Sequence, residues 1–239
     1  MEFIERGVAY HMGELQRGFS SGVLDENLIE NMDNMHFMIN MDNGKTLGFR
    51  GNEEVKYADV ISGGVGMTMV VKITGGPNAK IGVPFMIFKN KDETHPIRRV
   101  PDDRTDVCYR TTKKVNDKEF PANATHLVQP ADSFVISKIK DAWSRQWEEK
   151  KMEKIAAGMW QGNGVTGSGA LQNPQKPYFL KLAAAVVKDV NNQITKKTCP
   201  TDPDMNYDRK AMIRYGLSKN ITGVWKEQQL SPELQNIVK

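Results

Sequence analysis

The chain has 239 residues, of which 39% are hydrophobic and 26% charged, and it carries two cysteines and a formal net charge of +4. This length and composition exclude wholesale disorder and a disulfide framework, because such a chain buries a core without cross-links. The 33 basic and 29 acidic residues are interleaved, so the charge permits contact with nucleic acid without requiring it.

The start of the chain predicts one helix and then extended segments. Residues 1–26 repeat apolar side chains every three or four positions, which is typical of an amphipathic helix, and the stretch 18–22 with its two glycines ends it. Residues 28–33 and 36–41 alternate or run apolar, which predicts a pair of strands or one bent strand. The dipeptide Asn43-Gly44 then marks a turn.

The clearest strand signals lie in the next part of the chain. Segments 55–61, 67–74 and 81–89 are rich in Val, Ile, Thr and Phe, and glycine-containing turns separate them, which predicts a β-meander. Residues 91–123 are charged, broken by proline and without periodicity. An irregular stretch of this length is unusual inside a compact domain, where loops rarely exceed about 12–15 residues.

The second half of the chain predicts helices. Asp132 or Ser133 is suited to cap a helix that runs to about Ala157. Its apolar row, which should pack on the sheet, repeats every four residues as Val135, Ile139, Trp143 and Trp147. After a glycine- and asparagine-rich loop at 158–176, further helices are predicted over 177–189, over 206–218 and from Ser231. This order of elements is that of an α/β or α+β fold with one sheet.

The candidates for chemistry are carboxylates, since familiar catalytic motifs are absent from the sequence. Nothing matches a phosphate-binding loop or a nucleophile elbow, and the four histidines and two cysteines lack metal-binding spacing. Asp33 is predicted to end a strand and Asp132 to precede the amphipathic helix, so both are placed to share a divalent cation, which prefers oxygen ligands. The alternative is structural, with Asp132 capping the helix and Asp33 ending the strand.

Two segments carry a resemblance to a known family. Residues 30–51 read ENMDNMHFMINMDNGKTLGFRG, and residues 120–143 read FPANATHLVQPADSFVISKIKDAW. Together they resemble the DDE-superfamily transposase/endonuclease domain of the pogo/mariner kind, as encoded by mobile elements in oomycete genomes. In that family a strand ends in N-M-D-E-T, and a later motif contains T-H-L-x-Q-P-x-D. The resemblance continues through residues 210–217 and so covers most of the chain.

The resemblance implies an RNase H-like α/β fold, a mixed sheet flanked by helices, which cleaves and joins DNA strands with Mg²⁺ or Mn²⁺. Asp33 matches the first catalytic, metal-binding aspartate and Asp132 the third. The residues that lead into the third are matched by Thr125, His126, Leu127, Gln129 and Pro130. The expected parts are an N-terminal helical segment over 1–26, a DDE core over 27–158 and a C-terminal helical extension over 159–239.

Three departures from the family indicate a degenerate site. The N-M-D-E-T motif reads N-M-D-N-M over residues 31–35. The second catalytic aspartate, which the family carries in a strand–helix–strand unit, is missing. Only thirteen residues separate Thr111 from Thr125, and Asp117 is the nearest candidate for its place. The chain also begins about where the catalytic domain begins in the family, after its helix-turn-helix region.

We therefore expect an internally deleted DDE domain, catalytically inactive, with an exposed sheet edge and lowered stability. Two alternatives stay open. The chain is an active metal-dependent nuclease if Asp117 or Glu119 supplies the missing ligand. It is a non-enzymatic interaction scaffold if its tryptophans are exposed anchors, namely Trp143, Trp147, Trp160 and Trp225.

DNA is the partner that the resemblance implies. Lys138, Lys140 and Arg145 follow Asp132 on the predicted helix and are candidate contacts to the phosphate backbone, although an ordinary solvated helix face is the alternative. No apolar stretch is long enough to cross a membrane, and the N-terminus has no secretory pattern. Together with the two cysteines these features favour the cytoplasm or, from the resemblance, the nucleus.

Overall fold

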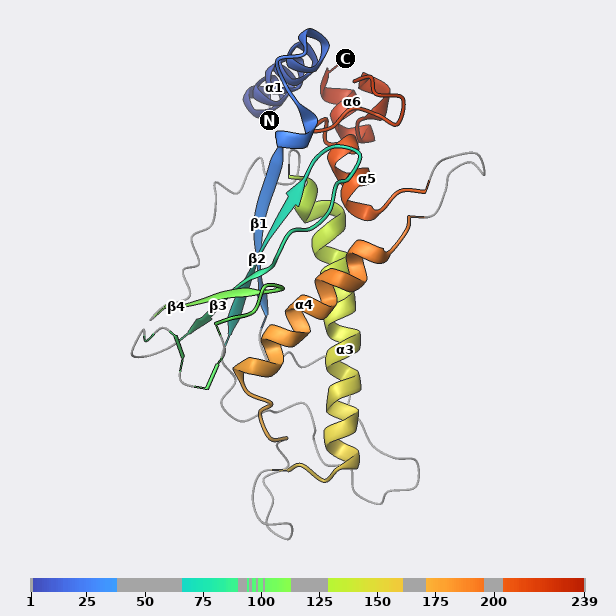
Figure 1. Ribbon diagram of the computed structural model, residues 1–239. Coiled ribbons are helices and arrows are strands. Elements are labelled where there is room, and N and C mark those ends of the chain that lie inside the picture. Colours follow the sequence, from blue (N-terminus) through green and yellow to red (C-terminus); the bar gives the residue numbers. More distant parts are fainter. Residues whose placement is uncertain are drawn as a thin grey trace, which may run out of the picture.

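A four-stranded mixed sheet and a pair of long helices packed on one of its faces form the centre of the molecule (Figure 1). The computed structural model describes residues 2–37, 66–89, 94–112 apart from 95, 98 and 101, 129–160, 171–195 and 204–238. The predicted α/β class with a mixed sheet is confirmed.

The sheet has the order β1-β2-β3-β4, with β1 (Glu30–Phe37), β2 (Met67–Thr74), β3 (Phe85–Lys89) and β4 (Cys108–Thr112). The first three strands run antiparallel, so the predicted meander is confirmed for β2 and β3, and β1 is one continuous strand. Segment 55–61 and the Asn43-Gly44 turn lie outside the described residues. β4 pairs parallel to β3 inside a stretch that the sequence predicts to be irregular. That prediction was wrong there, because a five-residue strand shows too little alternation to stand out and depends on its partner strand.

Helices follow the predicted positions. The described helices are α1 (Glu2–Ser21), α3 (Ile136–Ala156), α4 (Lys176–Asn192), α5 (Tyr207–Arg214) and α6 (Pro232–Val238), with short turns η1 (Glu26–Leu28), η2 (Ala131–Val135) and η3 (Glu227–Gln229). Asn206 caps α5, which ends before the predicted residue 218 because Gly216 takes a left-handed conformation at φ 75°. No described helix is both long and apolar enough to cross a membrane.

The main core lies between the sheet and the α3–α4 pair. The predicted apolar row of α3 is buried, with exposed fractions of 8% or less for Val135, Ile139, Trp143 and Trp147. Trp143 stacks on Phe37 of β1 with ring centroids 4.0 Å apart. The four-residue periodicity therefore predicted the buried face of this helix correctly.

A second apolar cluster joins the two ends of the sequence. α1 packs beside α6 and the segment before it, at one end of the molecule (Figure 1). Met12 and Phe19 of α1 are buried there together with Tyr215, Trp225 and Leu234. The division into parts at residues 26 and 158 stays a prediction, and in the structure α4 packs into the main core.

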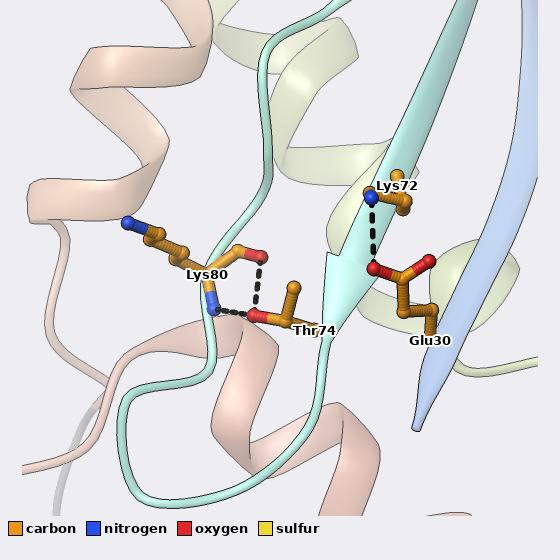
Figure 2. Close-up of polar contacts among 4 residues, drawn as sticks. All are labelled: Glu30, Lys72, Thr74 and Lys80. Carbon is orange, nitrogen blue, oxygen red and sulfur yellow. Dashed lines mark hydrogen bonds and ion pairs between the residues drawn. The ribbon is translucent and has the colours of Figure 1, made fainter. Parts of the chain in front are cut away.

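The turn between β2 and β3 is closed by its own polar groups. Thr74 N–H donates to the Lys80 carbonyl at 3.1 Å. The Thr74 hydroxyl also donates to that carbonyl at 3.4 Å and accepts the Lys80 N–H at 3.3 Å (Figure 2). Lys72 and Glu30 form an ion pair across β2 and β1 at 2.8 Å (Figure 2).

This turn is also tied to two distant segments. Gly75 N–H donates to the Ile29 carbonyl at 2.8 Å, and Gly76 N–H donates to Ser218 Oγ at 2.8 Å. Lys219 N–H in turn donates to Glu26 Oε2 at 2.9 Å. The chain before β1, the β2–β3 turn and the chain after α5 thus share one polar junction.

Candidate functional site

Asp33 lies on the face of β1 that is turned toward the helices. Alternate residues of a strand share a face, and the more buried set in β1 contains Asn31, Asp33, Met35 and Phe37. Asp33 is half-buried, pairs across the sheet with Val71, and its Oδ1 accepts the Asn34 N–H at 2.7 Å. The prediction that Asp33 ends the strand was wrong, because Met35 and Phe37 continue the buried row and the pairing with β2 runs on to Phe37.

Asp132 lies within η2, a single π-helical turn that leads into α3. The predicted helix cap was misplaced, because the helical backbone already begins at Pro130 and neither Asp132 nor Ser133 precedes it. Asn31 reaches across from β1 instead, and its Oδ1 accepts the Ala131 N–H at 3.3 Å. Such π turns are rare and often occur at functional sites.

The Asn31 contact brings the two predicted acidic positions onto touching elements. Asp33 follows Asn31 by two residues on the same strand face, about 7 Å along the strand, and Asp132 directly follows Ala131. β1 and η2 are in contact. That Asp33 and Asp132 form one site stays a prediction. Asn31 was missed at the level of sequence, although its position two residues before Asp33 places it on the same strand face.

The other predicted acidic ligands lie outside the described residues. These are Asp117 and the alternative Glu119, and the matched residues Thr125, His126 and Leu127 are also outside, whereas Gln129 and Pro130 lead directly into η2. Within the described ranges, no three His, Cys, Asp or Glu side chains gather where they could hold a metal ion. A two-metal centre needs a cluster of carboxylates, and the described side chains do not supply one around Asp33.

The predicted phosphate contacts on α3 divide into two kinds. Lys138 lies over the Tyr207 ring at 5.2 Å and 3.7 Å from Asp141, and Arg145 forms an ion pair with Asp189 of α4. Lys140 is exposed. A phosphate would compete with the partners of Lys138 and Arg145, and exposed pairs of this kind are worth at most about 1 kcal/mol.

Three of the four tryptophans are unsuited to anchor a partner. Trp143, Trp147 and Trp225 are 6–8% exposed, and Trp160 is half-buried. The Trp225 Nε1–H donates to the Gly216 carbonyl at 2.9 Å, so even its polar edge is used within the fold. This burial weakens the scaffold alternative.

We expect Asn31→Ala to lower the free energy of unfolding by about 1 kcal/mol, because it leaves the Ala131 N–H without the acceptor seen here. Asn34→Ala is the matched control, since Asn34 lies on the exposed face of the same strand. Urea unfolding of both variants measures the difference. Equal stabilities would contradict a role for Asn31 in holding η2 against β1.

Comparison of the chain with protein-family models, with curated proteins and with solved structures finds no match.

Proposed function

We propose that the chain is a transposase-derived DDE domain, nucleic-acid-binding in origin, that no longer cleaves DNA. The observation that carries the proposal is the Asn31–Ala131 hydrogen bond, which links the strand of Asp33 to the turn of Asp132. In the family that the sequence resembles, the positions of Asp33 and Asp132 hold the first and third catalytic aspartates. Two aspartates can share a metal ion only if the elements that carry them lie side by side, as β1 and η2 do.

The proposed loss of activity rests on the ligand set. A two-metal phosphoryl-transfer site needs several carboxylates to position both ions, and positioning supplies most of the catalysis. The family motif that carries the second aspartate is missing between Thr111 and Thr125. With that ligand gone, Mg²⁺ or Mn²⁺ would bind weakly, and a bound ion would lack the partner that a two-ion centre needs.

The proposed RNase H-like ancestry and internal deletion are supported by the position of β1. In the described sheet β1 is an edge strand, with β2 as its one strand neighbour. Loss of a strand–helix–strand unit is expected to leave such an edge beside Asp33, and an edge strand presents unpaired backbone groups. In this proposal the chain acts in the nucleus or cytoplasm.

Binding to DNA is the first test. We expect the immobilised protein to retain duplex DNA at about 50 mM salt and to release it by about 200 mM salt. Contacts between the protein and DNA phosphates weaken steeply as the salt concentration rises. Lys140→Glu should reduce retention at the lower salt, whereas Lys80→Glu, an equal charge change at an exposed residue of the β2–β3 turn, should reduce it less. No retention even at about 50 mM salt would overturn the binding half of the proposal.

Nicking of supercoiled plasmid in Mn²⁺ tests the inactive half. We expect the native chain to nick no faster than Asp33→Asn and Asp132→Asn, which keep the side-chain shape and remove the charge. Nicking by the native chain that both variants lose would instead favour the active endonuclease. If the protein neither retains DNA nor nicks the plasmid, the result would favour the non-enzymatic scaffold.

A further inference from the structure

The side chain of Asp208 is completely buried. Asp208 is the second residue of α5, and its exposed fraction is 0%. Neither of its oxygens has a hydrogen-bond partner of ordinary geometry among the described residues, and no ion pair to it is found there. Ionising a buried carboxylate is costly when no hydrogen bond of ordinary geometry stabilises the charge, so the site favours the neutral acid.

The surroundings of Asp208 form a junction of three segments. Asn191 of α4 bonds both backbone groups of Ile81, accepting its N–H at 2.8 Å and donating to its carbonyl at 2.9 Å. Asn206 donates to the Ala79 carbonyl at 2.7 Å and caps α5 by accepting the Arg209 N–H at 2.8 Å. The segment 75–84, the end of α4 and the start of α5 are thus joined by amide hydrogen bonds around the acid.

We propose that Asp208 is a pH-sensitive latch, whose neutral form lets α5 dock on segment 75–84 and α4 and whose ionisation loosens that docking. This inference does not depend on the proposed DNA-related function. It does bear on the candidate site, because α5 also packs against η2, the turn that contains Asp132.

The charged neighbours do not neutralise the acid. The charged residue of segment 75–84 is Lys80, which is exposed, and on α4 Lys188 is exposed while Asp189 pairs with Arg145. On α5 itself Arg209 has a buried Nη1 without a hydrogen-bond partner in the described part, and Lys210 is half-buried. Arg214, the last charged residue of α5, lies over the Phe134 ring, and Lys138 of α3 lies over the Tyr207 ring. η2 carries Asp132, and Asp204 precedes α5.

Burial raises the pKa of Asp208 from its ordinary 3.8 to about 7, and the backbone amides of Ile81 and Asp208 offset this in part. The folded state therefore holds a proton that the unfolded state has lost between these two pH values. The stability that depends on this proton is fully present below about pH 4 and is lost as the pH rises through about 7. The difference between the two pKa values corresponds to at most roughly a thousandfold change in the unfolding equilibrium constant.

Hydrogen exchange read as protection factors at pH 6 and pH 8.5 tests the latch. In the native chain we expect the amides of α5 and of Ile81 to lose about tenfold in protection at the higher pH, relative to amides in the middle of α3. Asp208→Asn keeps the shape of the side chain without its charge and should abolish this loss. Asp204→Asn, four residues earlier at an exposed position, should leave it unchanged.

A carbon-13 titration of the carboxyl groups measures the pKa of Asp208 in the native chain directly. We expect one aspartate to titrate near neutral pH and its signal to be missing from Asp208→Asn. Titration of Asp208 near pH 4 would overturn the proposal. The same loss of protection in the native chain and in Asp208→Asn would also overturn it.

Discussion

Gly75→Ala is expected to destabilise the fold by about 3 kcal/mol or more, because a methyl group has no space at this position. A Cβ on Gly75 would lie 2.3 Å from the Glu26 carbonyl oxygen and 3.1 Å from Ser218 Oγ. The first of these atoms belongs to backbone, which cannot rotate away as a flexible side chain would. The clash therefore falls on the junction that joins the start of β1, the β2–β3 turn and the chain after α5.

Gly7→Ala is the control for this substitution. Gly7 lies inside α1, and a Cβ there would meet nothing within 4 Å. Alanine favours a helix interior over glycine by up to about 1 kcal/mol, so this variant should be slightly more stable than the native chain. Urea unfolding compares the two. A Gly75→Ala variant within about 1 kcal/mol of the native chain would show that the three segments do not meet as closely as described.

The sequence predicted the elements whose signals are local and repeated. The row from Val135 to Trp147 specifies one helix face by itself, and Ser231-Pro232 marks the start of α6 at the residue where the helix begins. β4 escaped prediction because five residues around Tyr109 acquire their strand conformation from β3. Asp33 was misplaced along its strand because burial of Met35 and Phe37 follows from packing against the helices, which alternation in a polar segment shows poorly.

The sequence motifs nominate the acidic residues of the candidate site, but the contacts around those residues could not be predicted. Asp33 and Asp132 stand out by their positions in two motifs. The Asn31 hydrogen bond joins residues one hundred positions apart, so it depends on the tertiary arrangement of β1 and η2. Asp208 was missed because its position in the sequence suggests an exposed side chain. An acid in the first turn of a helix ordinarily faces solvent near the positive end of the helix dipole, and the sequence does not show that segment 75–84 covers it.

The stack between Trp143 and Phe37 should be the most costly single contact to remove from the main core. Trp143 is 6% exposed and lies between Phe37 of β1 and Phe179 of α4, with ring centroids 4.0 Å and 6.2 Å away. Trp143→Ala removes the whole ring and leaves a cavity, for which losses of about 3–5 kcal/mol are typical. Because β1 has one strand neighbour in the described sheet, the loss should fall on the strand that carries Asp33.

Met152→Ala on the same helix separates this effect from a change in helix propensity. Met152 is 38% exposed, so its removal should cost less than about 1 kcal/mol. Urea unfolding followed by tryptophan fluorescence and by far-ultraviolet circular dichroism measures both variants, and the second probe does not depend on the deleted ring. If Trp143→Ala cost no more than Met152→Ala, the aromatic stack would not be what holds β1 to α3. The edge strand beside the candidate site would then owe its position to the Asn31–Ala131 bond and the pairing with β2.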